Sequence, residues 1–174
     1  MSDTVANTGI VCFSHGKESG PDGLKISELA AVAKELGWQV ESLDYRGMDD
    51  PQARIDKLVA WCKLQRQVPV LAGSSMGGAV AAAAANVVPV RGVYLMAAAV
   101  NVSGYEHVNP QPTYDVPVSM VHGSGDDIIP FRNALKFALD CNARFVLTDD
   151  EHGLSGSLPT LRSSFAALLQ GLPS

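Results

Sequence analysis

The sequence predicts a single α/β domain over residues 1–174, with about six parallel strands between two layers of helices. Two observations and one general rule favour this three-layer α/β/α fold. The length of 174 residues fits one domain. Short apolar runs alternate along the chain with segments whose apolar residues recur at helical spacing. Strands that are separated by helices form a parallel sheet covered on both faces.

The first half of the chain supplies three strands and three helices. The strands are predicted over residues 9–13, 38–43 and 68–72. Apolar residues recur at helical spacing between residues 29 and 36 and stop at Gly37, a residue type that often ends helices. Pro51 opens a second helix, since proline fits the first helical position. An alanine-rich third helix is expected over residues 79–86.

The second half repeats this alternation. Its strands are predicted over residues 92–97, 116–121 and 144–148. Helices are expected over residues 131–138 and 158–169. The long irregular segment 98–115 contains Pro110 and Pro112. Because ligands bind beyond the carboxyl ends of parallel strands, we expect this segment to lie over the site.

Composition and charge argue against nucleic acid and a membrane as partners. Apolar residues make up 47% of the chain, charged residues make up 18%, and the net charge is −5. Without a Lys/Arg-rich run, the chain is not expected to bind nucleic acid. No apolar stretch reaches the roughly 18 residues of a membrane span, and the first residues lack the pattern of a secretory signal. We therefore expect a cytoplasmic protein with no membrane partner, and the oligomeric state stays open.

The cysteines and histidines indicate neither disulfides nor metal. Cys12, Cys62 and Cys141 are widely spaced and odd in number, so we expect reduced thiols that mostly serve packing. No His or Cys pair has the spacing of metal ligands. No cofactor is predicted.

The segment Gly73-Ser74-Ser75-Met76-Gly77 matches Gly-x-Ser-x-Gly, the turn that presents a nucleophilic serine between a strand and a helix. Such a turn strains the serine backbone and brings together the residues two before and two after it, so both are expected to lack side chains. The pattern also fits a glycine-rich turn with a surface serine. Its place after a strongly apolar strand and before a helix makes Ser75 the predicted nucleophile.

A serine hydroxyl needs a base to remove its proton, and the chain has four histidines. His15 and His122 each end a strand in a His-Gly pair and are expected to shape the strand end. His107 lies in the long loop and is expected to be solvated. His152 follows the last strand, in a loop that should cross the carboxyl edge of the sheet, so we predict that it is the base. Its acidic neighbours, residues 149–151, are expected to be solvated.

The carboxylate that orients the base should follow an intermediate strand. The segment 122–130 offers two candidates, Asp126 and Asp127. An aspartate ahead of Pro130 can also cap the next helix, and that role suits Asp127 better. These residues alone leave the choice of carboxylate open.

Four segments together make the whole chain resemble the α/β-hydrolase superfamily. They are residues 13–16 (Phe-Ser-His-Gly), 73–77, 122–130 and 152–153. Ser, Asp and His then follow one another along the chain in the order that the superfamily has. The resemblance implies a small, cap-less serine hydrolase that lacks the first two strands of larger members and whose cap is reduced to the segment 98–115.

The resemblance also implies roles for single residues. The superfamily motif His-Gly-x-x-Asp-x-x-Val-Pro puts the acid at Asp126, with Ile129 where valine is commoner. The His-Gly pair after the first strand would lead into the oxyanion loop, and His15 would then be structural. The oxyanion donors would be the backbone N–H groups of Met76 and of Lys17 or its neighbour.

The predicted activity is hydrolysis of a small ester or thioester through an acyl-enzyme, with Ser75, His152 and Asp126 as a triad. The expected partner is therefore a small-molecule ester or thioester. An alternative is a binding protein that keeps the scaffold without turnover. A nucleotide-binding domain is a third hypothesis, but residues 14–20 match neither a Gly-x-Gly-x-x-Gly turn nor a P-loop.

Overall fold

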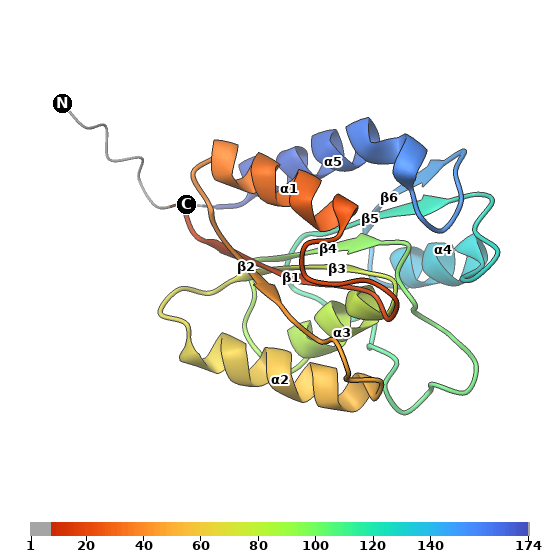
Figure 1. Cartoon of the computed structure of the whole chain (residues 1–174), viewed down its shortest axis with the longest axis horizontal. Helices are drawn as coiled ribbons and strands as arrows, with labels where there is room; N and C mark the ends of the chain where they lie inside the picture. Colours follow the sequence, from red (N-terminus) through yellow and green to blue (C-terminus); the bar gives the residue numbers. More distant parts are fainter. Residues whose placement is uncertain (1–7, 174) are drawn as a thin grey trace.

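The computed structural model describes residues 8–173, and a β-sheet runs through its centre (Figure 1). Its strands are β1 (Ile10–Ser14), β2 (Gln39–Leu43), β3 (Val70–Ser74), β4 (Gly92–Met96), β5 (Val118–Gly123) and β6 (Arg144–Thr148). The helices are α1 (Leu24–Glu35), α2 (Pro51–Leu64), α3 (Met76–Ala85), α4 (Phe131–Asp140) and α5 (Leu158–Gly171), with a short 3₁₀ turn, η1 (Ser155–Ser157). The strand order is β2-β1-β3-β4-β5-β6, and all neighbours are parallel. The predicted sheet of six parallel strands is confirmed.

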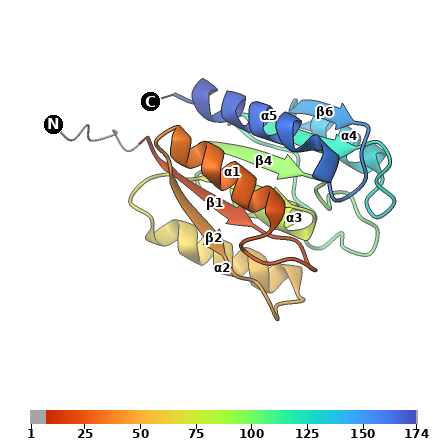
Figure 2. The same ribbon diagram turned by 45° about the horizontal axis from the view of Figure 1, so that its top comes forward.

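Helices cover both faces of the sheet and give the three predicted layers. Figure 2 shows α1 and α5 side by side on one face, and α2 and α3 lie on the other. Alternate residues of β1 enter different cores, because successive side chains of a strand point to opposite faces. Val11 and Phe13 pack with α1 and α5, whereas Cys12 packs with Cys62 of α2 in the second core. These two cysteines serve packing, as predicted.

Two strands begin two residues later than predicted. β3 begins at Val70 and β5 at Val118, each directly after a proline, Pro69 and Pro117. Proline has no N–H to donate to the ladder of the sheet. The apolar residues at 68 and 116 therefore extend the hydrophobic run but not the strand.

The strand order fixes where a ligand can bind. β2 lies on one side of β1, and β3 and the later strands lie on the other side. The order of the strands therefore reverses its direction between β1 and β3. A crevice forms beyond the carboxyl ends of strands at such a point. The loops that follow β1 and β3 carry Lys17 and Ser75, and the loops that follow β5 and β6 carry Asp126 and His152.

The connection from β4 to β5 contains the segment 98–115, to which the cap is expected from the sequence to be reduced. Residues 97–117 contain neither helix nor strand, so no cap domain is inserted here. The side chain of Asn86, at the end of α3, accepts from the N–H of Gln111 (2.9 Å) and donates to its carbonyl (3.0 Å). This pair of hydrogen bonds anchors the long segment to the body of the fold.

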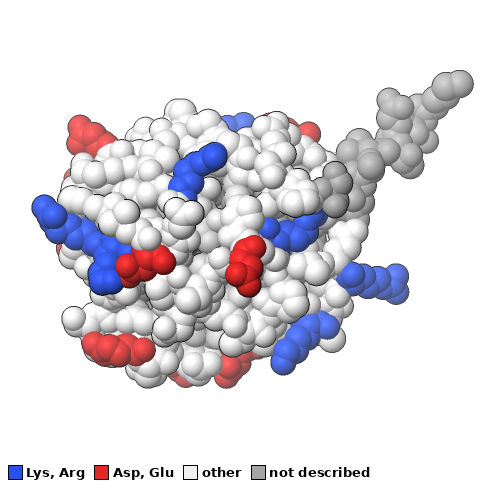
Figure 3. All heavy atoms as spheres, turned by 180° about the vertical axis from the view of Figure 1, so that it is seen from behind, with Lys and Arg blue, Asp and Glu red and all other residues white. Residues whose placement is uncertain are grey.

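The surface carries charges of both signs. In Figure 3, Lys and Arg side chains are interspersed with Asp and Glu and separated by uncharged surface. None of the helices within residues 8–173 is long and apolar enough to cross a lipid bilayer.

Candidate active site

Ser75 stands between β3 and α3 in a strained backbone conformation, with φ 56° and ψ −122°. A non-glycine residue in such a conformation costs of order 1–3 kcal/mol and persists only where its surroundings hold it. The Ser75 N–H donates to the carbonyl of Met96 (3.0 Å), and the Ser75 carbonyl accepts the N–H of Ala99 (2.9 Å). Met96 is the last residue of β4 and Ala99 lies just beyond it, so the neighbouring strand holds the turn. Helix α3 begins directly after it, at Met76 rather than at Ala79 as predicted.

Two glycines allow this turn to form, each for its own reason. A Cβ atom on Gly73 would lie 2.1 Å from the carbonyl oxygen of Gly77, which is the close approach expected from the sequence. A Cβ atom on Gly77 would lie 2.0 Å from the carbonyl oxygen of Ser14, at the end of β1. One glycine therefore closes the turn, and the other lets α3 rest against β1.

The side chains of Ser75, His152 and Asp126 form one hydrogen-bonded chain. His152 Nε2 lies 3.0 Å from Ser75 Oγ, and His152 Nδ1 lies 2.7 Å from Asp126 Oδ2. An ionised carboxylate only accepts, so the Nδ1 atom of the imidazole carries the proton. Nε2 of the neutral ring is then free to accept the proton of the serine hydroxyl. The structure brings together three residues that follow three different strands.

Of the two candidate carboxylates, the structure brings Asp126 to the imidazole. Asp126 Oδ1 accepts the backbone N–H groups of Ile128 (3.0 Å) and Ile129 (2.8 Å). A second imidazole contacts the carboxylate, because His122 Nε2 lies 3.1 Å from Asp126 Oδ2. Asp127 is exposed, and no side chain caps α4, so the capping role expected for Asp127 is wrong.

The loops that follow β5 and β6 are tied to each other. The N–H of Gly125 donates to the carbonyl of Asp150 (3.0 Å), and a Cβ atom on Gly123 would lie 2.4 Å from that oxygen. The Asp150 carboxylate accepts the hydroxyl of Ser157 (2.8 Å), and this bond is the main cause that lowers the pKa of Asp150. The sequence predicted a solvated acidic loop. Asp150 instead holds the loop to the start of α5.

The loop that follows β1 lies against Ser75 from another side. A Cβ atom on Gly16 would lie 3.4 Å from the Cβ atom of Ser75. The backbone N–H of Lys17 donates to no residue within 8–173. Met76 is the first residue of α3, so its N–H has no acceptor inside the helix. Lys17 and Met76 line the same cavity as Ser75.

A cavity of about 560 Å³ opens at Ser75. The loop after β1, the start of α1, helix α3 and the long segment between β4 and β5 supply its walls. The long segment contributes mainly apolar side chains, among them Val102, Tyr105 and Val108. This position agrees with the expectation that the segment lies over the site. Among the described residues, no group of three His, Cys, Asp or Glu side chains is arranged to hold a metal ion.

Lys25 is a half-buried cation in the wall of this cavity. Its ammonium donates to the backbone carbonyl of His152 (3.5 Å). Burial lowers the pKa of Lys25, and the negative charges of Asp126 and Asp150 oppose this effect. The contact joins the start of α1 to the loop that carries the imidazole.

The sequence model of the alpha/beta hydrolase family matches residues 13–173. The chain belongs to the alpha/beta hydrolase family. No curated protein is significantly similar to it in sequence.

Solved structures share the fold of this hydrolase-family chain. A protein assigned to the hydrolases of the alpha/beta superfamily, from Xanthomonas campestris pv. campestris, is 34% identical, with a TM-score of 0.87 over 95% of this chain and 99% of that chain. A serine hydrolase without lid from Xanthomonas campestris is 20% identical, with a TM-score of 0.78 over 100% of this chain and 87% of that chain. Est1E from Butyrivibrio proteoclasticus is 15% identical, with a TM-score of 0.79 over 94% and 88%. The last two likenesses concern the fold alone.

The contacts of two side chains near the site of this hydrolase-family chain were not predicted from its sequence. His122 was expected only to shape the end of a strand, yet it contacts Asp126, which stands four residues later. Arg54 is almost fully buried, 1% exposed, although the sequence predicted no function for it. A signal for Arg54 was present, because it stands one helical turn before Leu58 and thus puts a charge on the apolar face of its helix.

Proposed function

We propose that this protein is a serine hydrolase that cleaves a small ester or thioester through an acyl-enzyme, without a cofactor. The observation that carries the proposal is the continuous chain of hydrogen bonds from Asp126 through His152 to Ser75. This arrangement of carboxylate, imidazole and hydroxyl is the one that activates a serine for attack on a carbonyl carbon. Membership of the alpha/beta hydrolase family supports it.

The first half of the reaction forms the acyl-enzyme. Ser75 Oγ attacks the carbonyl carbon of the ester while His152 Nε2 takes the hydroxyl proton. The negative charge that develops on the carbonyl oxygen is stabilised by the N–H groups of Met76 and Lys17. The bond to the alcohol or thiol then breaks, and the imidazolium gives its proton to the leaving oxygen or sulfur. Asp126 stays ionised and stabilises the imidazolium.

The second half releases the acid. A water molecule takes the place of the alcohol or thiol, and His152 accepts one of its protons as the oxygen attacks the acyl carbon. The same two N–H groups stabilise the second tetrahedral intermediate. Its collapse breaks the bond to Ser75 Oγ, which regains its proton from the imidazolium.

The cavity supports a small or extended substrate. Its volume of about 560 Å³ falls within the range of small-molecule sites, about 300–1,000 Å³. The apolar side chains of Val102 and Val108 suit an acyl or alkyl group, since such a group gains from contact with apolar surface. The acyl and leaving groups are then selected by the segment between β4 and β5.

Labelling with a fluorophosphonate tests the nucleophile. We expect the wild-type protein to gain the mass of one phosphonyl group, because Ser75 Oγ displaces fluoride from phosphorus. The Ser75→Ala variant should gain none. Equal labelling of both proteins would refute the assignment.

A panel of short p-nitrophenyl esters tests turnover. We expect release of p-nitrophenol from at least the acetate or butyrate ester, and loss of this activity in Ser75→Ala. The alternative of a binding protein on the same scaffold is the better conclusion if the wild-type protein leaves every ester intact.

A further inference from the structure

Arg54 is a buried cation that forms no ion pair with a carboxylate of the described residues. None of the ion pairs within residues 8–173 includes it, although its side chain is almost completely removed from solvent. Its guanidinium lies 5.3 Å from the centre of the Tyr45 ring. Burial lowers the pKa of Arg54, the negative charge of Asp49 opposes this effect, and a guanidinium stays protonated in proteins. Burying a charge without a counter-ion in contact is costly, so the contacts that Arg54 makes instead need an explanation.

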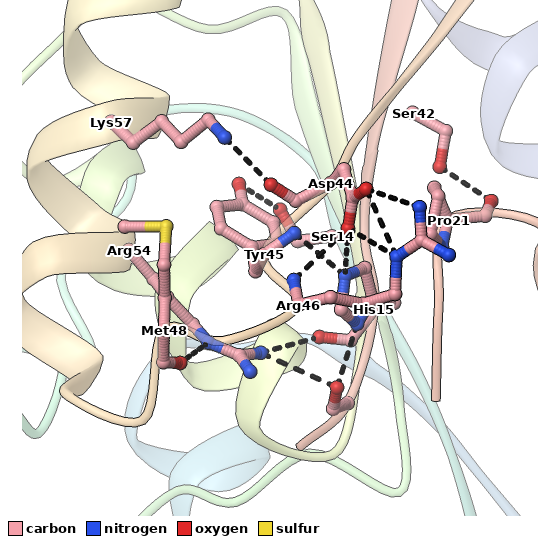
Figure 4. Close-up of polar contacts among 11 residues, drawn as sticks. Ser14, His15, Pro21, Ser42, Asp44, Tyr45, Arg46, Met48, Arg54 and Lys57 are labelled. Carbon is pink, nitrogen blue, oxygen red and sulfur yellow. Dashed lines mark hydrogen bonds and ion pairs between the residues drawn. The ribbon is translucent and has the colours of Figure 1, made fainter. Parts of the chain in front are cut away.

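Those contacts are three backbone carbonyls, shown in Figure 4. From helix α2, Arg54 Nε donates to the carbonyl of Met48 (2.7 Å). Arg54 Nη1 donates to the carbonyls of His15 (3.1 Å) and Gly16 (3.3 Å), in the loop that follows β1. The guanidinium therefore holds the loop next to Ser75.

The carbonyl of Gly16 accepts a second hydrogen bond from the imidazole of His15. His15 Nδ1 lies 2.7 Å from the Gly16 oxygen, and His15 Nε2 accepts the N–H of Tyr45 (2.8 Å). The ring is therefore neutral, with its proton on Nδ1. Two donors, one of them cationic, meet on one carbonyl oxygen.

The Gly16 carbonyl and the Lys17 N–H belong to the same peptide group. The described residues contain no cis peptide bond, so the Gly16 carbonyl and the Lys17 N–H point in opposite directions. The carbonyl points to Arg54 and His15, which directs the N–H away from them. This N–H donates to no residue in the described part of the chain, and Lys17 lines the cavity at Ser75.

We propose that Arg54 is a positioning residue that orients and polarises the Gly16–Lys17 peptide as an oxyanion donor. The inference rests on the proposed function, because it assumes that a negative charge develops beside Ser75. Donors on a carbonyl oxygen strengthen the N–H of the same amide as a donor, and hydrogen bonds in chains reinforce one another. Arg54 also brings a positive charge near the developing oxyanion without touching the substrate.

An arginine suits this position better than a lysine. The planar guanidinium reaches the carbonyls of Met48, His15 and Gly16 at once and packs on the Tyr45 ring. An ammonium at the end of a flexible stem keeps the charge but not this geometry. Arg54→Lys is therefore expected to lie between wild type and Arg54→Met in kcat and in the affinity for a transition-state analogue.

The test compares kcat and KM for p-nitrophenyl acetate with the affinity for phenylboronic acid, which forms a tetrahedral adduct on an active-site serine. Loss of a whole oxyanion donor lowers kcat by about 10²–10³-fold, and here the donor remains but is weakened and misoriented. We expect Arg54→Met to lower kcat by about 10–100-fold while KM stays within about twofold. The inhibition constant of phenylboronic acid should rise by a similar factor. Arg46→Met is the matched control, since Arg46 is an exposed arginine that pairs with Asp44, and it should behave as wild type.

The outcomes separate the two proposals. An inactive wild-type protein that no fluorophosphonate labels would overturn the proposed function and this inference with it. An active wild-type protein whose folded Arg54 variants keep kcat and phenylboronic acid affinity within twofold would overturn this inference alone. A fall in kcat without a change in phenylboronic acid affinity would do the same. If Arg54→Met does not fold, as judged by circular dichroism, Arg54→Lys decides, with an expected loss of at least about fivefold in kcat.

Discussion

Two His-Gly pairs stand on opposite sides of Ser75. His15 and its glycine follow β1, and His122 and its glycine end β5. Both imidazoles are buried, and burial lowers the pKa of each from the ordinary value of 6.5. Both rings are therefore neutral at pH 7, and the difference between them lies in what they hold.

The two rings use their nitrogens differently. His15 uses both, since Nδ1–H donates to the next carbonyl and Nε2 accepts the N–H of Tyr45. His122 uses Nε2 alone, which lies 2.9 Å from the carbonyl oxygen of Ile129 and 3.1 Å from Asp126 Oδ2. Its Nδ1 atom is buried and has no partner among the described residues. His15 therefore bonds backbone groups alone, whereas His122 contacts both a backbone carbonyl and a carboxylate.

This contrast teaches that a dipeptide at a strand end has no fixed role. After β1 the histidine holds only backbone groups, whereas at the end of β5 it also contacts the carboxylate of Asp126. The role of each histidine depends on its hydrogen-bond partners. Most of these partners lie outside the His-Gly pair, so the pair alone does not reveal them.

The largest effect is expected on the β5 side, where the carboxylate itself is replaced. Asp126→Asn should lower kcat for p-nitrophenyl acetate by about 10³–10⁴-fold, because an amide N–H facing His152 Nδ1 favours the tautomer that cannot accept the serine proton. KM should change little. Asp127→Asn is the matched control, since Asp127 is exposed and its substitution should leave kcat unchanged. Equal losses in the two variants would contradict the assignment of the acid.

A smaller effect is expected when the second imidazole is removed. His122→Leu leaves the Ile129 carbonyl and the Asp126 carboxylate with one donor fewer, which should lower the free energy of unfolding by about 1–3 kcal/mol. We expect kcat to fall by about tenfold, since the carboxylate keeps its two backbone donors. Urea unfolding and steady-state kinetics measure both quantities. Wild-type kcat in His122→Leu would mean that the contact with Asp126 is without consequence for the reaction.

The sequence predicted the sheet and the residues at its edge better than the contacts around them. Gly73, Ser75 and Gly77 carry a local backbone requirement, and such requirements can be read from a short pattern. The partners of Arg54 and Asp150 could not be predicted, because they are backbone carbonyls and a hydroxyl on other elements. The choice of Asp126 over Asp127 likewise depended on a family motif.

The smallest effect concerns the dependence of stability on pH. Because His15 and His122 have lowered pKa values in the folded state, the unfolded chain binds protons more readily below pH 6.5. The stability that they contribute is fully present above pH 6.5 and is lost as the pH falls toward their folded-state pKa values. Each ring should add at most about 1.4 kcal/mol per pH unit to the loss.

Urea unfolding between pH 5 and pH 7 measures this loss. We expect a shallower dependence in His15→Leu and in His122→Leu than in wild type. A slope that stays the same in both variants would show that other groups cause the loss.

A crystal structure of the adduct with diethyl p-nitrophenyl phosphate would test most directly that Ser75 attacks while two amides receive the oxyanion. We expect phosphorus bonded to Ser75 Oγ and its phosphoryl oxygen about 3 Å from the backbone nitrogens of Met76 and Lys17. Phosphorus on another residue, or a phosphoryl oxygen turned away from both amides, would contradict it.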